Sequence, residues 1–557
     1  MFEGKRGRSL ISALEFKNAI ISGSNNIFKH RNHLNELNIF PVPDGDTGTN
    51  MCMTIMGVSE ELSKKDFESV SDVADIISHT ALRCSRGNSG VILSIILRGF
   101  SKQLKGKSEI RSCDLVQSLE TGVKDAYASV SNPVEGTMLT VARVASEYGR
   151  KSFENENSFV EILEKVCEGA RTALDDTPNL LPVLKKAHVV DAGGKGLCLI
   201  FEGMLSFIKN GVIVSTDLNS LSFEEDSKFE SEVKKFDDDF RFTYCTEFIV
   251  SKNVDQSFNP DILTNDLKKI GDCVIVMHDE EVIKAHVHSN FPDKVLSNAL
   301  MYGKLINVKV DNLEEQSKNL VNKESVSLEE DVKIVEPSKD FGILSIARGD
   351  GIINLFKEIG CDYVLEGGQS LNPSADQIAN SILHIPAKTV YVLPNNKNII
   401  MSAEQAVEYV SDRDVVIIPT RTIPQGISAS LAFDSNLSRE ENVKNMTDSI
   451  SKVKTGHVTY AARDSEFGGF KIQRGDIISL LDGKLKVVDK DRIHATERLL
   501  QMMCDKNSTF VSLIFGMDIT DDEVESVKSF VEGKFKNVEV SVIDGKSSMY
   551  YFIISVE

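Results

Sequence analysis

The spacing of apolar residues changes twice along this chain, and that change restricts the possible folds more than any single motif. Up to about residue 210 the apolar residues recur at helical spacing, as at Phe159, Ile162 and Val166. Breaks that contain glycine or proline separate the helical runs at 41–48, 86–90, 131–136 and 191–196. We therefore predict an all-α first domain over residues 1–212, with its unusual residues confined to the loops between helices.

Two polar stretches divide the rest of the chain. Residues 213–239 are acidic and are predicted to be a linker, and short β-rich runs such as YCTEFIV and VIKAHVH follow them. These runs predict a small α/β or α+β middle domain over 240–312. A second linker, 313–338, precedes the runs FGILSIA, CDYVLEGG, TVYVLPNN and DVVIIPT, each followed by a helix-like segment. This alternation predicts a C-terminal α/β domain with a mainly parallel sheet over 339–557.

Length and charge exclude several classes of protein. A chain of 557 residues needs more than one core, and its formal net charge of −20 argues against binding to nucleic acid through phosphate contacts. The nine cysteines form no CxxC pair, as expected of a reduced cytosolic protein. The most apolar run, VILSIIL, is closed by Arg98 and is much shorter than a bilayer span. We expect a cytoplasmic protein with no transmembrane segment, in which membrane contact is limited to the surface.

The loop PVPDGDTGTNM carries the first chemical signal. Asp44 and Asp46 surround one glycine, but the calcium loop that begins in this way fails at its fifth and twelfth positions, and no Walker A pattern is present. Two carboxylates on a tight loop suit Mg²⁺, and Asn38 at the preceding helix end adds a carbonyl oxygen. Thr47 to Asn50 lead into an apolar helix, whose free N–H groups favour phosphate. This loop alone supports a capped turn and a magnesium–nucleotide site equally well.

Three further breaks favour the nucleotide site. Arg86-Gly-Asn-Ser-Gly90, Glu135-Gly-Thr-Met138 and Asp191-Ala-Gly-Gly194 each precede a helical run. Each is, by itself, more often a helix cap than a ligand-binding loop. Four such loops on one helical domain are harder to explain as caps, because helix starts that share a site form a cradle for phosphate.

The motifs PVPDGDTGTNM, RGNSGVILS, EGTML and VVDAGGKGL together resemble the nucleotide-binding domain of the dihydroxyacetone kinase family. The three-part chain is more closely similar to the family of catalytic subunits of bacterial fatty acid kinase. The resemblance covers nearly the whole chain and is most specific in the first 200 residues. It implies an eight-helix antiparallel barrel that holds ATP at one end through the loops between helices.

The resemblance also assigns site residues. It implies that Asp44 and Asp46 bind two Mg²⁺ ions and, with Thr47, form the catalytic group. The residues implied to line or close over the nucleotide are Thr47, Gly48, Thr49, Asn50, Asn88, Ser89, Thr137, Met138, Asp191, Ala192 and Gly193. The sugar kinases of the family carry a third aspartate ahead of the loop, where this chain has Asn38 with one extra residue between. The third metal ligand therefore stays open.

The acceptor implied by the resemblance is a fatty acid presented by a separate fatty-acid-binding protein, and the product is an acyl phosphate for phospholipid synthesis. A carboxylate is already ionised near neutral pH, so its phosphorylation needs no general base. None of the four loops contains a histidine, and this favours a carboxyl acceptor. Two alternatives stay open: a kinase for a small hydroxylated substrate, and a nucleotide-binding regulatory scaffold. Family similarity also implies a homodimer.

The other two domains carry weaker signals. Cys245 would share one face of a strand with Glu247, as would His286 with His288, and such residues suit Zn²⁺. A half-buried strand face explains the same pattern, but the family resemblance implies metal binding by the cysteine and both histidines. The fourth ligand stays open: Glu247 is one candidate that could instead form a salt bridge, and His278 and Asp279 are weaker alternatives. In the last domain the resemblance implies docking of the fatty-acid-binding protein. Lys397 and Arg421, in loops after predicted strands, are our candidate contacts.

Overall fold

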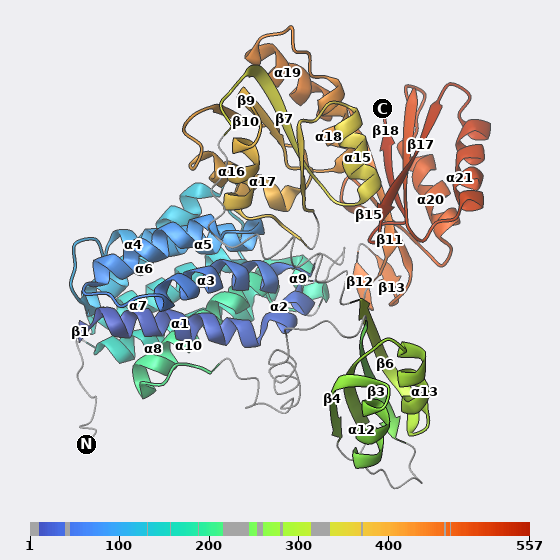
Figure 1. The fold of residues 1–557 in the computed structure, drawn as a ribbon. Helices are drawn as coiled ribbons and strands as arrows, with labels where there is room; N and C mark the ends of the chain where they lie inside the picture. Colours follow the sequence, from blue (N-terminus) through green and yellow to red (C-terminus); the bar gives the residue numbers. More distant parts are fainter. Residues whose placement is uncertain are drawn as a thin grey trace. The chain divides into compact units, whose positions relative to one another are not determined.

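The computed structural model in Figure 1 describes residues 10–38, 45–130, 132–155, 157–187, 189–215, 244–252, 260–278, 282–312, 335–368, 371–461, 464–467 and 469–557. These residues belong to two compact units. The first combines residues 1–216 with 333–557, and the second spans 217–332. Each unit is described by itself below.

The first part of the larger unit is a helical barrel. Among its described residues it contains eight helices of at least 14 residues: α1 (Ala13–Lys29), α3 (Thr47–Ser63), α4 (Val70–Arg83), α5 (Gly87–Lys102), α6 (Ser112–Ser129), α7 (Met138–Glu154), α8 (Phe159–Leu180) and α10 (Ala192–Asn210). Each long helix packs against the next one, and α10 packs against α1, so the ring is closed. The predicted all-α domain and its eight-helix barrel are confirmed.

Smaller elements complete this domain. These are the helices α2 (Arg31–Leu37) and α9 (Pro182–Ala187) and a pair of two-residue strands, β1 (Leu10–Ile11) and β2 (Ile110–Arg111). Local sequence explains several helix ends. Ser12 and Ser158 start α1 and α8 with reciprocal capping boxes to Glu15 and Glu161, and α10 stops at Gly211, whose φ of 71° suits glycine. A single apolar core fills the barrel.

The C-terminal part of the same unit begins with a four-stranded parallel sheet. Its strands are β7 (Lys339–Ala347), β8 (Tyr363–Glu366), β9 (Ala387–Leu393) and β10 (Asp414–Ile417), in the order β10-β9-β7-β8. The helices that alternate with or follow them are α15 (Asp350–Glu358), α16 (Ala375–Leu383), α17 (Lys397–Val407), α18 (Ile423–Leu431) and α19 (Arg439–Ile450). Because all its strand pairs are parallel, this sheet confirms the predicted α/β alternation.

A second sheet follows, and its order was not predicted. The strands β11 (Lys454–Tyr460), β14 (Ile477–Leu481), β15 (Lys484–Asp489), β16 (Phe510–Gly516), β17 (Glu539–Ser547) and β18 (Phe552–Val556) are arranged as β15-β14-β11-β18-β16-β17. Only the β16–β17 pair is parallel among these described pairings. The helices α20 (Arg492–Met503) and α21 (Asp521–Lys534) pack on this sheet, and β12 (Ser465–Phe467) pairs with β13 (Phe470–Ile472) as a separate hairpin.

The barrel and the parallel sheet are joined through several contacts. The helix α17 packs on α5 and α16 contacts α4. Arg83 Nε lies 3.1 Å from Asp376 Oδ1, and Arg98 Nη1 lies 3.1 Å from Glu408 Oε2. Surface pairs of this kind contribute little stability each. They lie at the start of α16 and at the end of α17, so both helices face the barrel.

The smaller unit is a four-stranded antiparallel sheet with two helices. Its elements are β3 (Tyr244–Lys252), α12 (Pro260–Lys268), β4 (Gly271–His278), β5 (Val282–Ser289), α13 (Pro292–Leu300) and β6 (Gly303–Asn312), with the strand order β4-β5-β3-β6. Phe248, Leu263, Leu267 and Val295 belong to its core. No helix in the described part of the chain is both long and apolar enough to cross a bilayer.

Candidate active site

Four helix starts lie together at one end of the barrel. A Cβ added at Gly87, the start of α5, would come within 2.5 Å of Asn50 Nδ2 in the first turn of α3. One added at Gly196 in α10 would come within 2.6 Å of Met51 Sδ. Asp191 accepts a hydrogen bond from the backbone N–H of Gly194 (2.7 Å) and also from the N–H of Met138, the first residue of α7. The positive ends of α3, α5, α7 and α10 therefore meet at one end of the barrel, an arrangement that attracts anions.

Of the two aspartates predicted to bind Mg²⁺, the structure describes Asp46. It is the N-cap residue of α3, yet its side chain makes no cap hydrogen bond. Instead Oδ1 accepts from Asn38 Nδ2 at 3.3 Å, and Oδ2 accepts from Asn372 Nδ2 at 2.6 Å. The side chain is buried, and this burial raises the pKa of Asp46 above its usual range. Asp44, the other predicted metal ligand, lies outside the described residues.

Gly48 and Thr49 contact α2 rather than open space. A Cβ at Gly48 would come within 2.2 Å of the carbonyl oxygen of Arg31, so only glycine permits this approach of α2 to α3. The side chain of Asn35 both accepts from the N–H of Thr49 and donates to its hydroxyl, each at 3.0 Å. These contacts hold the first turn of α3 against α2, and with it the position of Asp46.

A cavity of about 1000 Å³ opens at this end of the barrel. The predicted residues that line it are Asn38, Asp46, Thr47, Asn50, Asn88, Ser89, Lys397 and Arg421. The described predicted residues outside this lining are Gly48, Thr49, Thr137, Met138, Asp191, Ala192 and Gly193. The cavity thus brings the first two loops of the barrel together with the loops of the sheet domain.

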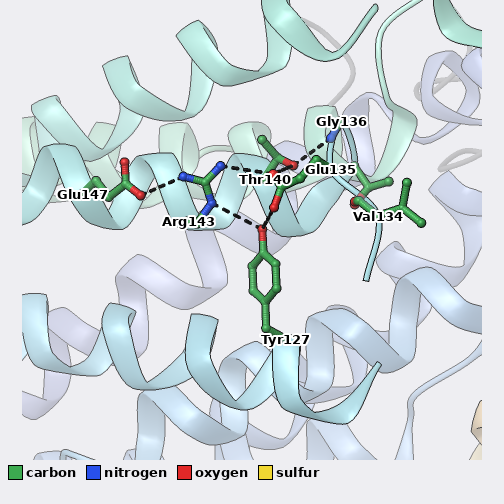
Figure 2. Close-up of polar contacts among 8 residues, drawn as sticks. Tyr127, Val134, Glu135, Gly136, Thr140, Arg143 and Glu147 are labelled. Carbon is green, nitrogen blue, oxygen red and sulfur yellow. Dashed lines mark hydrogen bonds and ion pairs between the residues drawn. The ribbon is translucent and has the colours of Figure 1, made fainter. Parts of the chain in front are cut away.

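The start of α7 is fixed by a separate polar network. Figure 2 shows Tyr127 from α6 and Arg143 from α7 meeting at Glu135. The Oε2 atom of Glu135 accepts from Thr140 Oγ1 at 2.6 Å and from Arg143 Nη2 at 3.1 Å, and Tyr127 donates to Oε1 at 2.9 Å. These bonds lower the pKa of Glu135, first through the Thr140 hydroxyl. Gly136 sits in this turn with a φ of 86°. The network therefore ties the turn that precedes α7 to both α6 and α7.

Asp191 connects the starts of α7 and α10. Desolvation raises its pKa to about 6, although its two backbone hydrogen bonds oppose this shift. Gly193 lies against Met138, since a Cβ there would come within 2.8 Å of the Met138 Cε atom. The third and fourth predicted loops therefore touch each other, but they do not line the cavity.

The sheet domain contributes the carboxyl ends of its four parallel strands to the cavity. Lining residues follow each strand: Arg348 after β7, Gly367 after β8, Asn395 and Lys397 after β9, and Arg421 after β10. Asn395 has a φ of 56°, and its amide donates to Ser345 Oγ (2.9 Å) and to the carbonyl of Ile346 (3.0 Å). This edge of a parallel sheet is where ligands bind in α/β folds.

Asn372 binds Asp46 directly and was not predicted from the sequence. It belongs to the segment GGQSLNP, which follows β8 and whose glycines, asparagine and proline are ordinary turn residues. Nothing in the sequence links Asn372 to Asp46, because the two positions are 326 residues apart. Only the packing of α16 and α17 on the barrel brings them together.

The structure gives the backbone register at the candidate zinc site of the middle domain. In the β3–β5 pair, Cys245 is opposite His288 and Glu247 is opposite His286. The side chains of these four residues lie outside the described ones. Among the side chains that are described, no group of three or more His, Cys, Asp or Glu could hold a metal ion.

Comparisons with known proteins match nearly the whole chain. Residues 342–557 match the C-terminal domain of the FakA-like family of fatty acid kinase, residues 241–320 match the middle domain of the same family, and residues 41–206 match the DAK2 domain. Protein YloV of Bacillus subtilis (strain 168) is 38% identical over 550 residues, which cover 97% of this chain and 98% of that protein. An uncharacterized protein of Staphylococcus aureus (strain USA300) is 36% identical over 555 residues, covering 99% of this chain and 100% of its own length.

Among solved structures, the dihydroxyacetone kinase from C. freundii, in complex with AMP-PNP and Mg²⁺, aligns with 37% of this chain and 36% of its own. The sequence identity is 18% and the TM-score is 0.29.

Proposed function

This chain belongs to the FakA-like family of fatty acid kinase, and we propose that it transfers the γ-phosphoryl group of ATP to a fatty acid carboxylate. The fatty acid would be presented by a separate fatty-acid-binding protein, and the acyl phosphate would supply phospholipid synthesis. The observation that carries this proposal is the buried Asp46 carboxylate at the start of α3, which lines a large cavity together with the start of α5.

The donor set at this end of the barrel fits Mg²⁺. Carboxylate and amide oxygens are the hard ligands that Mg²⁺ prefers, together with phosphate oxygens and water. Asp44, Asp46 and the side-chain oxygen of Asn38 would hold it. The raised pKa of Asp46 agrees with this role, because a buried carboxylate without a cation is held in an unfavourable charged state. A bound Mg²⁺ would neutralise the negative charge of the ATP phosphates.

The barrel itself would bind and orient the triphosphate. Backbone N–H groups at the starts of α3 and α5, with the side chains of Thr47, Asn88 and Ser89, line the cavity where phosphate would lie. In the reaction, a carboxylate oxygen of the fatty acid forms a bond to the γ-phosphorus. The bond from that phosphorus to the bridging oxygen breaks, and its electron pair leaves with ADP. No proton moves, so positioning and charge neutralisation are enough.

The acceptor would reach the site on its carrier. A long acyl chain must be shielded from water, and the cavity lining contains many charged and polar residues, among them Arg348, Asp350, Glu366 and Asp482. The carrier would therefore keep the chain buried and offer only the carboxylate. Arg421 lines this cavity and stays our proposed contact for the carrier; Lys397, the other residue predicted to contact the carrier, lines the same cavity.

A zinc ion in the middle domain and a homodimer complete the proposal. The register that places Cys245 opposite His288 supports a site that also includes His286. Elemental analysis of the purified protein should find about one zinc per chain, and less in a Cys245→Ser, His288→Ala variant. Zinc-free wild-type protein would exclude this site. Light scattering of the same samples tests the dimer.

Transfer of label from [γ-³²P]ATP tests the proposed activity. We expect labelled, hydroxylamine-sensitive product from oleate only when the fatty-acid-binding protein is present, and none with an Asp44→Ala, Asp46→Ala variant. Carrier-free labelling of a small hydroxylated compound would instead support a sugar-kinase-like enzyme. Nucleotide binding with no transfer to any acceptor would support a regulatory scaffold.

A further inference from the structure

One residue of the sheet domain binds directly to the candidate metal ligand. The amide nitrogen of Asn372 donates to Asp46 Oδ2 at 2.6 Å, and the same atom lies 3.4 Å from Asn50 Oδ1. Asn372 is 3% exposed and Asp46 is 5% exposed, so water does not compete for this bond. A short hydrogen bond to an ionised acceptor is among the stronger kinds in proteins.

The barrel holds the Asn372 loop in place from the other side. Arg86 Nη1 donates to the carbonyl oxygen of Asn372 at 3.3 Å, and the N–H of Ala375 donates to the carbonyl of Ser85 at 3.2 Å. Gly87 has a φ of 53°, and a Cβ there would come within 3.1 Å of Asn372 Nδ2. The start of α5 therefore leaves room for the Asn372 side chain, because Gly87 has no Cβ at the place where the two residues are close.

Lys397 approaches Asp46 from the same domain. It is the first residue of α17 and lines the cavity, and it lies near enough to favour the charged form of the Asp46 carboxylate. Its neighbour Asn398 accepts a hydrogen bond from Asn88 Nδ2 at 3.2 Å, so the starts of α17 and α5 are in contact. Among the described residues, no carboxylate lies within ion-pair distance of the Lys397 amine. A lysine without a partner carboxylate, at the wall of this cavity, suits an anionic ligand.

We infer that the sheet domain forms the second wall of the phosphoryl-transfer centre: Asn372 positions the Asp46 carboxylate, and Lys397 contributes positive charge for the nucleotide phosphates. This inference rests on the proposed function. A carboxylate oxygen can accept more than one bond, so Asn372 can hold Asp46 Oδ2 while a cation binds. Groups that orient a metal ligand in this way typically contribute about 10–100-fold to metal affinity. The helical barrel alone would accordingly be an incomplete kinase.

Mn²⁺ binding to the full-length protein tests this inference without measuring acyl transfer. Electron paramagnetic resonance would give the Mn²⁺ affinity in the presence of AMP-PNP, and a parallel titration would give the AMP-PNP affinity at saturating Mg²⁺. The variants are Asn372→Leu, Lys397→Met and the charge-conserving Lys397→Arg. Glu408→Gln is the matched control, because it breaks an ion pair between the same two domains away from Asp46. Thermal melting checks that every variant is folded.

We expect Asn372→Leu to weaken Mn²⁺ binding about 10–100-fold, Lys397→Met to weaken AMP-PNP binding, and Lys397→Arg to restore most of it. Glu408→Gln should match the wild type in both titrations. If Asn372→Leu and Lys397→Met also match a wild type that binds Mn²⁺ and AMP-PNP, the inference is wrong and the proposed function stands. An equal loss in Glu408→Gln would assign the effect to domain docking and would also overturn the inference. A wild type that binds neither probe would overturn both proposals.

Discussion

A Gly48→Ala variant tests whether the close packing of α3 against α2 holds Asp46 in position. In a Gly48→Ala variant, the added Cβ would lie 2.2 Å from the carbonyl oxygen of Arg31 and 2.8 Å from the Leu34 Cβ atom. Carbon atoms pack best at about 3.5–4.0 Å, so α2 must move by about 1 Å or more. No side-chain rotation can relieve a contact with a backbone oxygen.

The expected size of the effect follows from two opposing contributions. Overpacking of this kind costs about 1–3 kcal/mol, and a backbone contact belongs at the upper end. Alanine favours the helical backbone over glycine by at most about 1 kcal/mol. The net loss is therefore about 2 kcal/mol, which is roughly a 30-fold rise in the local opening equilibrium. Since Asn38 is the C-cap of α2, the shift should also disturb the contact between Asn38 and Asp46.

Hydrogen–deuterium exchange is the suitable assay because it resolves α2 and the first turns of α3. We expect roughly 30-fold faster exchange in these segments, for the reason just given. Gly533→Ala in α21 is the control, since a Cβ there meets nothing within 4 Å, and its helix should exchange more slowly. Unchanged or slower exchange around Gly48 would refute the argument that close packing against Arg31 requires glycine.

Three further predictions concern Asp191, His457 and Glu408. Desolvation raises the pKa of Asp191 to about 6. Between pH about 4 and about 6 the folded state therefore binds a proton that the unfolded state has released. The free energy of unfolding should fall as the pH rises through this range. Urea denaturation across this range should show a flatter profile for Asp191→Asn. Desolvation lowers the pKa of His457 to about 4, so stability should fall as pH drops from about 6.5 to about 4, and His457→Gln should remove that fall. The Glu408→Gln variant loses an exposed ion pair with Arg98, so its free energy of unfolding in denaturant titrations should fall by less than about 1 kcal/mol, with phosphoryl transfer unchanged. A larger fall in the free energy of unfolding would show that this pair holds the two domains together.

Local patterns in the sequence predicted much of this fold. Helical spacing, glycine-bearing breaks and caps such as Ser158 act within a few residues, so they are visible without a structure. The alternation of strands and helices from residue 339 predicted the parallel sheet for the same reason. The order of the second sheet was not predictable, because β18 pairs with both β11 and β16 across long stretches of chain.

The same distinction between local patterns and long-range contacts applies to the candidate site. Asp46, Thr47 and Asn88 were predicted from motifs that start helices, and the structure places all three on one cavity. Asn372 was not predicted, because its role depends on docking of a distant domain rather than on its own loop. Thr49 is the opposite case, because its motif suggests a contact with a ligand. In the structure, however, its hydroxyl and its N–H are hydrogen-bonded to Asn35.

The nature of the acceptor is the central claim, and hydroxylamine trapping tests it most directly. Acyl phosphates react with neutral hydroxylamine to give hydroxamates, whereas phosphate esters of sugars do not. After incubation with ATP, Mg²⁺ and a fatty-acid-binding protein loaded with oleate, mass spectrometry should detect oleoyl hydroxamate with wild-type protein and none with Asp46→Asn. ATP consumption without hydroxamate, under conditions in which the carrier is loaded, would contradict a carboxyl acceptor.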